Sequence, residues 1–87
     1  MKPESDVEII FYAMVTRGRS SSVGKQIQEW TDLPVDRIIP AIYNNPGLFN
    51  VKKMDSEDPL GFSVGLISGP MSDQLGRKLK IDYKSSG

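Results

Sequence analysis

Cysteine and histidine are both absent from this sequence. Their absence excludes disulfide bonds, zinc sites built from these residue types, and nucleophilic catalysis that uses imidazole as its base. Long apolar runs are also lacking, because no stretch approaches the roughly 20 residues that span a bilayer. The N-terminal residues are polar and acidic, unlike those of a secretory signal peptide. We therefore expect a cytoplasmic protein with no membrane partner.

A net charge is missing too, because 11 basic residues balance 11 acidic ones. The field of the whole molecule therefore offers no general attraction to nucleic acid. Any contact with DNA must come from a local cluster of cations.

Catalytic and cofactor sites are not indicated. The 87 residues suffice for one small domain, and their pattern identifies no pocket for paired catalytic carboxylates. Carboxylates gather in residues 55–58, but their order differs from that of a calcium-binding EF-hand loop. We expect that the protein is not an enzyme and that it holds no metal or other cofactor.

A capping box predicts a first helix that begins after Ser5 and ends just before Gly18. The Ser5 hydroxyl accepts a backbone N–H bond from three residues on, and Glu8 reaches back to the helix start. Apolar residues at helical spacing then predict one buried stripe, formed by Val7, Ile10, Phe11 and Met14. Ile9 and Tyr12 lie off this stripe, so we expect them to meet the C-terminal segment or another subunit.

Two short helices joined by about three residues are predicted next, and such a pair is a helix-turn-helix. Ser22 is the expected N-cap of the first, whose apolar face consists of Val23, Ile27 and Trp30. Pro34 suits the first position of the second, in which Val35, Ile38, Ile39 and Ile42 share a face. Pro40 removes one helical hydrogen bond at a cost of roughly 3 kcal/mol, so we expect a kink or an early end there.

A β-hairpin and a C-terminal arm complete the predicted order. Residues 48–54 are rich in aromatic and branched side chains, and residues 60–67 alternate between apolar and small or polar ones. Beyond residue 70 the spacing fits a helix or a strand, and Gly76 favours a strand or an extended arm because glycine weakens helices. We expect one domain over residues 1–69 and an arm over residues 70–87.

Residues 5–67 resemble the winged helix-turn-helix superfamily, which includes many small bacterial and phage transcription regulators. The similarity rests on residues 23–30, VGKQIQEW, on residues 35–43, VDRIIPAIY, and on residues 46–49, PGLF. It implies an α+β fold of three helices followed by a two-stranded hairpin, called the wing. It also implies a sequence-specific DNA-binding regulator with its third helix in the major groove.

Carried onto this chain, the resemblance implies that Arg37 pairs with guanine and Asn44 with adenine. Ser22 and Lys25 would lie near phosphate at the start of the second helix. The remaining candidates for DNA contact are Arg17, Arg19, Ala41 and Lys53. The acidic hairpin tip departs from the pattern, because its carboxylates repel phosphate, so the wing should stay outside the groove.

A protein-interaction module on the same fold is the alternative hypothesis. The zero net charge, the acidic hairpin tip and surplus apolar side chains favour it. The residues expected at a dimer or partner interface are Ile9, Tyr12, Ile81 and Tyr83. The third helix offers few side chains that can contact bases, so we also expect the protein to bind DNA as a homodimer.

Overall fold

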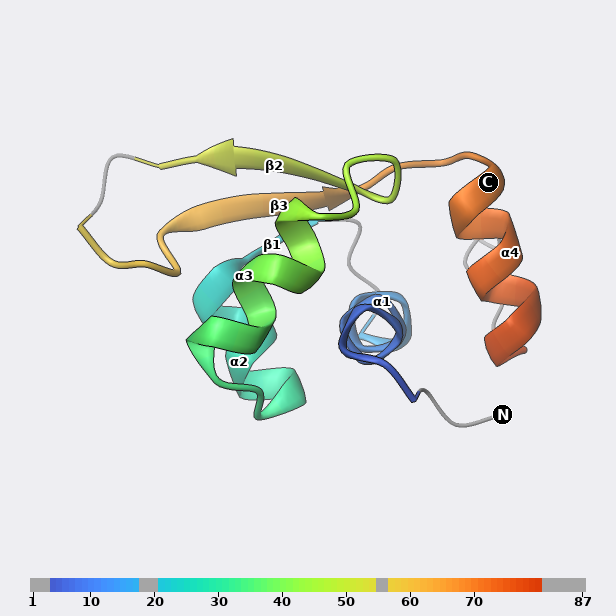
Figure 1. Cartoon of the computed structure of the whole chain (residues 1–87), viewed down its shortest axis with the longest axis horizontal. Coiled ribbons are helices and arrows are strands. Elements are labelled where there is room, and N and C mark those ends of the chain that lie inside the picture. Colours follow the sequence, from blue (N-terminus) through green and yellow to red (C-terminus); the bar gives the residue numbers. More distant parts are fainter. Residues whose placement is uncertain (1–3, 18–20, 55–56, 81–87) are drawn as a thin grey trace.

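The computed structural model describes residues 4–17, 21–54 and 57–80, which form four helices and three strands. In chain order these are α1 (Asp6–Thr16), β1 (Ser21–Val23), α2 (Gly24–Thr31), α3 (Val35–Tyr43), β2 (Phe49–Lys53), β3 (Phe62–Leu66) and α4 (Pro70–Leu79). The strands make one antiparallel sheet in the order β1-β3-β2, with α1, α2 and α3 below it in Figure 1. The predicted α+β class is confirmed. In the part of the chain described, no helix is long and apolar enough to cross a membrane.

Helix α1 begins and ends where the sequence predicts. The backbone N–H of Glu8 donates to the Ser5 hydroxyl over 3.3 Å. The Glu8 carboxylate reaches back to the N–H of Glu4 at 3.1 Å instead of that of Ser5, so the box is shifted by one residue. Ile9 is half-buried and packs against the core, whereas Tyr12 is 37% exposed. Ile9 is thus only partly covered by the core, and its place at a partner interface stays a prediction.

Strand β1 was not predicted, and it changes the start of the second helix. Ser22 does not cap α2 but pairs with Val64 in the middle of β1. Helix α2 starts at Gly24, with Val23 as a cap residue that lacks a side-chain bond and is 38% exposed. The extended conformation prevails because β3 offers its backbone groups to residues 21–23, and these pairs satisfy more donors than one cap would.

Gly24 brings the start of α2 against the turn before β3. A Cβ on this residue would stand 2.5 Å from the backbone oxygen of Leu60 and 3.0 Å from the ring of Phe62. Such a distance is too short for any side chain. Glycine is thus required for the close approach of α2 and the hairpin.

Helix α3 runs past the proline that was expected to kink it or end it early. Pro34 is extended and precedes the helix as its cap, one position before the one predicted. Pro40 lies inside the helix, which continues to Tyr43, so the early end was wrong. Ile38 and Ile42 are fully buried on either side of Pro40. Burial of each stabilises by about 1.5–3 kcal/mol, which offsets the roughly 3 kcal/mol cost of proline.

The described part of the C-terminal arm forms the helix α4, where a strand or extended arm was expected. Pro70 occupies the first turn of α4, and Gly76 is tolerated as a buried residue. Leu79 is only 2% exposed and belongs to the core. Its burial outweighs the cost of about 1 kcal/mol for an internal glycine. Ile81 and Tyr83 lie outside the described residues.

Helix α4 is tied to α1 by an ion pair. The ammonium of Lys78 donates to the Glu8 carboxylate over 2.6 Å. This hydrogen bond lowers the pKa of Glu8, and the N–H of Glu4 adds to the effect. Figure 1 shows α4 beside α1 at the far end from the hairpin tip. The C-terminal segment thus covers part of α1, one of the two options left open by the sequence.

The hairpin follows the predicted alternation. Strands β2 and β3 pair in antiparallel register, with Val51 opposite Val64. Leu60, Phe62 and Val64 are buried, and Leu66 is half-buried. The buried hydrophobic cluster between helices and sheet comprises Ile10, Phe11, Met14, Ile27, Leu33, Ile38, Ile42, Leu48, Phe49, Leu60, Phe62, Val64 and Leu79.

Candidate functional site around helix α3

Helices α2 and α3 are joined by the three residues 32–34. Asp32 is left-handed, with φ 58°, and its N–H donates to the oxygen of Gln28 at 2.8 Å. The Gln28 amide donates in turn to the oxygen of Leu33 at 3.2 Å, and Leu33 is buried. These bonds fix the turn and with it the position of α3 beside α2.

The cation of α3, Arg37, is exposed but lies to one side of the residues that point directly outward. Since successive residues turn by 100°, the side opposite the buried Ile38 and Ile42 presents Asp36, Pro40 and Asn44, all exposed. We call the side toward the start of α1 the α1 flank, and the side toward β2 and β3 the hairpin flank. The α1 flank comprises Arg37, Ala41 and Asn44 with Asp6, and the hairpin flank comprises Ile39 and Tyr43 with Phe62 and the residues around it.

The α1 flank is held together by a forked ion pair. Arg37 donates from Nε to one carboxylate oxygen of Asp6 at 3.0 Å and from Nη2 to the other. The Asp6 carboxylate raises the pKa of Arg37, mainly through these hydrogen bonds. A shallow depression of about 320 Å³ lies here, lined by Asp6, Val7, Asp36, Arg37, Pro40, Ala41, Asn44 and Asn45. Three predicted DNA-contact residues, Arg37, Ala41 and Asn44, are thus neighbours, with Ala41 half-buried.

A second ion pair engages Lys25, the cation of α2. The ammonium of Lys25 lies 3.0 Å from a carboxylate oxygen of Asp58 in the hairpin turn. Asp58 also accepts from the N–H of Leu60 at 2.9 Å. This backbone bond, followed by that from Lys25, lowers the pKa of Asp58. The sequence did not indicate this cationic partner of Asp58.

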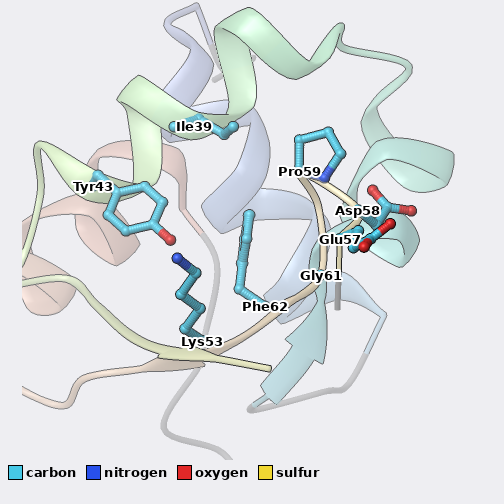
Figure 2. A pocket seen from close by; sticks show the side chains of 8 residues that line it. All are labelled: Ile39, Tyr43, Lys53, Glu57, Asp58, Pro59, Gly61 and Phe62. Carbon is cyan, nitrogen blue, oxygen red and sulfur yellow. The ribbon is translucent and has the colours of Figure 1, made fainter. Parts of the chain in front are cut away.

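The hairpin flank is an open pocket of about 460 Å³ between α3 and the hairpin (Figure 2). The rings of Tyr43 and Phe62 meet edge to face, with centroids 5.8 Å apart and an interplanar angle of 74°. In Figure 2 the Lys53 ammonium points toward the Tyr43 hydroxyl, and two carboxylates stand on the other side of Phe62. The pocket is lined by Ile39, Tyr43, Lys53, Glu57, Asp58, Pro59, Gly61 and Phe62. No local sequence pattern indicates this pocket, since its walls lie on elements far apart in the chain.

The other predicted DNA-contact residues are dispersed. Ser22 is buried in β1, and its hydroxyl has no hydrogen-bond partner in the described part of the chain, so this structure does not expose it to a phosphate. The guanidinium of Arg17 lies 6.0 Å from the ring centroid of Trp30, within cation–π range. Lys53 lies in the hairpin flank, and Arg19 is outside the described residues. The structure therefore brings together the residues of α3 but not the full predicted set.

No protein-family model matches the chain, and searches of curated proteins and of solved structures return no significant match. Over the described residues, no three acidic side chains converge in a way that could hold a metal ion.

Proposed function

We propose that this domain is a winged helix-turn-helix DNA-binding transcriptional regulator that presents α3 to the major groove. The observation that carries the proposal is the exposed helix α3, joined to α2 through a fixed three-residue turn, with the β2–β3 hairpin beside it. This is the arrangement by which helix-turn-helix proteins place a reading helix. Figure 1 shows the hairpin extending past α3 as a wing would.

The α1 flank supplies the base contacts in this proposal. Arg37 and Asn44 are exposed, and their side chains can form paired hydrogen bonds with guanine and adenine, respectively. Ala41 lies between them, and its methyl group can contact the methyl group of thymine. Lys25 contacts phosphate from the start of α2. Because one copy offers few cations, a homodimer is favoured, in which two copies double the number of phosphate contacts.

A duplex titration tests this proposal. Anisotropy of a labelled duplex, measured at about 50 and about 200 mM salt, should show binding that weakens steeply as salt rises. Arg37→Ala should weaken specific binding by about tenfold, the effect of losing one bidentate base contact. Arg77→Ala is the matched control, since Arg77 is exposed on α4, outside the α2–α3 pair. Binding that ignores salt, or equal losses in both variants, would contradict the proposal.

The hairpin flank favours a second candidate function, a protein-interaction module. Tyr43 is 48% exposed although its ring packs on Phe62, so the pocket offers an apolar floor to a partner. Glu57 and Asp58 stand at one end of that floor. The occupant this arrangement suits is a segment of another protein that inserts a leucine-like side chain and places a cation beside Glu57.

Amide chemical shifts of the labelled chain test the second candidate. A short peptide with leucine before lysine should shift the signals of Ile39, Tyr43 and Phe62 at millimolar concentration. The same peptide with glutamate in place of lysine should do so less. Tyr43→Ala should abolish the shifts, whereas Tyr12→Ala, at an exposed tyrosine on α1, should not. No shifts with either peptide would exclude this occupant.

A further inference from the structure

The helices of the α2–α3 pair each carry a single cation, and both cations are engaged by carboxylates from outside the pair. Lys25 is the one basic residue of α2, and Arg37 is the one basic residue of α3. Their partners are Asp58 in the hairpin turn and Asp6 in the first turn of α1. Two elements that flank the pair therefore each hold one of its cations.

We propose that Asp6 and Asp58 occupy the two cations that DNA would contact and so hold the domain in a charge-latched form with low affinity. Asp58 takes the place of a phosphate on Lys25. Asp6 takes the place of a guanine edge on Arg37. This inference rests on the proposed DNA-binding function and names how that same surface is controlled. DNA must displace Asp58 from Lys25 before a phosphate can bind there. It must likewise displace Asp6 from Arg37 before a guanine can bind there. The freed carboxylate then also repels the incoming strand. The latch thus lowers affinity twice, by occupying the cation and by its own charge.

The geometry of the two pairs suits a latch that opens. The side chains of Lys25 and Arg37 are 73% and 56% exposed, so both pairs are in contact with water and salt. Such pairs are weak, and a polyanion that offers many phosphates competes with them effectively. Arg37 uses two parallel hydrogen bonds, whereas Lys25 is held by a single contact. Asp6 is therefore the stronger half of the latch.

Neutral amides can remove the latch while keeping the fold. In Asp58→Asn the side-chain oxygen can still accept from the N–H of Leu60. In Asp6→Asn the cap at Ser5 is untouched, because Glu8 is its donor. A variant that pairs Glu29→Gln with Asp32→Asn is the matched control. It removes the same two charges from exposed sites that pair with no cation in the described part of the chain.

The experiment compares duplex binding by the wild-type chain, the latch variant D6N/D58N and the control variant E29Q/D32N. At about 50 mM salt, the latch variant should bind roughly tenfold more tightly than wild type, and the control about twofold. Without DNA, the Arg37 Nε–H resonance should move in Asp6→Asn, which reports loss of the pair directly.

The outcomes distinguish failure of the latch from failure of the proposed DNA binding. If wild type binds DNA and the two variants gain equally, the latch is overturned while DNA binding stands. If none of the three folded chains binds at low salt, the proposed function fails and the latch fails with it. If the latch variant binds more tightly than both wild type and the control variant, both are supported. An unmoved Arg37 resonance in Asp6→Asn would overturn the latch by itself.

Discussion

The two flanks of α3 differ in chemistry although they lie on one short helix. On the α1 flank, Arg37 is closed by a forked bond to Asp6. On the hairpin flank, Ile39 and Tyr43 face a pocket that the described residues leave open. The polar flank is thus satisfied within the molecule, whereas the apolar one is not.

This contrast shows why net charge alone says little about a binding surface. The chain is neutral overall, yet its balance is local, since each cation of the α2–α3 pair faces its own carboxylate. DNA binding at the α1 flank requires exchange of one anion for another. Binding at the hairpin flank depends mainly on the release of water from an apolar surface, with one charge contact at Glu57 added to it. The two candidate functions therefore respond differently to salt and to substitution.

The largest expected effect follows from the contact that places the hairpin flank. Gly24→Ala forces a methyl group against the backbone of Leu60 and should destabilise the fold by about 2–3 kcal/mol in urea melts. Gly69→Ala is the control, since its Cβ would meet nothing within 4 Å, and it should change stability by no more than about 0.5 kcal/mol. Equal effects would show that Gly24 does not set this contact.

The next effect concerns the anchor behind the α1 flank. Glu8, which is 6% exposed, has a pKa lowered from 4.5, chiefly by Lys78. Because the pKa of Glu8 is lower in the folded chain than in the unfolded one, its ionised carboxylate stabilises the fold above about pH 4.5. This contribution is lost as the pH falls through the pKa of Glu8 in the folded state. Glu8→Gln should cost about 1–2 kcal/mol at neutral pH and flatten the loss of stability toward about pH 3. Glu29→Gln should neither lower stability at neutral pH nor change its loss in acid. If stability fell with pH in Glu8→Gln as steeply as in wild type, Glu8 would not be the group responsible.

A smaller effect is expected from the exposed ring on the hairpin flank. Tyr43→Ala removes the edge-to-face contact with Phe62 and should destabilise by about 1 kcal/mol. It should leave duplex affinity within about twofold of wild type, because the contacts proposed for DNA lie on the other flank. A large loss of DNA affinity in Tyr43→Ala would mean that the flanks do not act separately.

The smallest effect on stability is expected at the fork itself. Arg37→Lys retains the charge but loses the planar pair of bonds to Asp6. Because the pair is exposed, the melting temperature should change by no more than about 2 °C. A drop of many degrees would show that this bond supports the fold rather than the binding surface.

Local signals account for what could be predicted of the fold. The hydrogen bond between Glu8 and Ser5 lies within one helical turn, so the start of α1 could be predicted from neighbouring residues. The alternation of β3 likewise appears in consecutive residues. Strand β1 has three residues, and its partners Ser63–Gly65 lie about 40 positions later, so no local pattern indicates it. Helix α4 was missed because its spacing also fitted a strand, and packing of Leu79 decides between them.

The same limit applies to the candidate site. Helical spacing placed Arg37 and Asn44 on the exposed side of α3, and the structure agrees. The partner of Arg37 lies 31 residues away in sequence, so only the packing of α1 against α3 reveals Asp6. The pocket at Tyr43 likewise depends on how the hairpin folds back toward α3. Which cations are occupied is a property of the tertiary structure.

The most direct test of DNA binding through the α1 flank is a titration of the isotope-labelled chain with a short duplex, followed by amide chemical shifts. The proposal predicts that the largest changes gather at Lys25, Arg37, Ala41 and Asn44, with Ile39 and Phe62 nearly still. Changes centred on Ile39, Tyr43 and Phe62, or no changes at low salt, would contradict it.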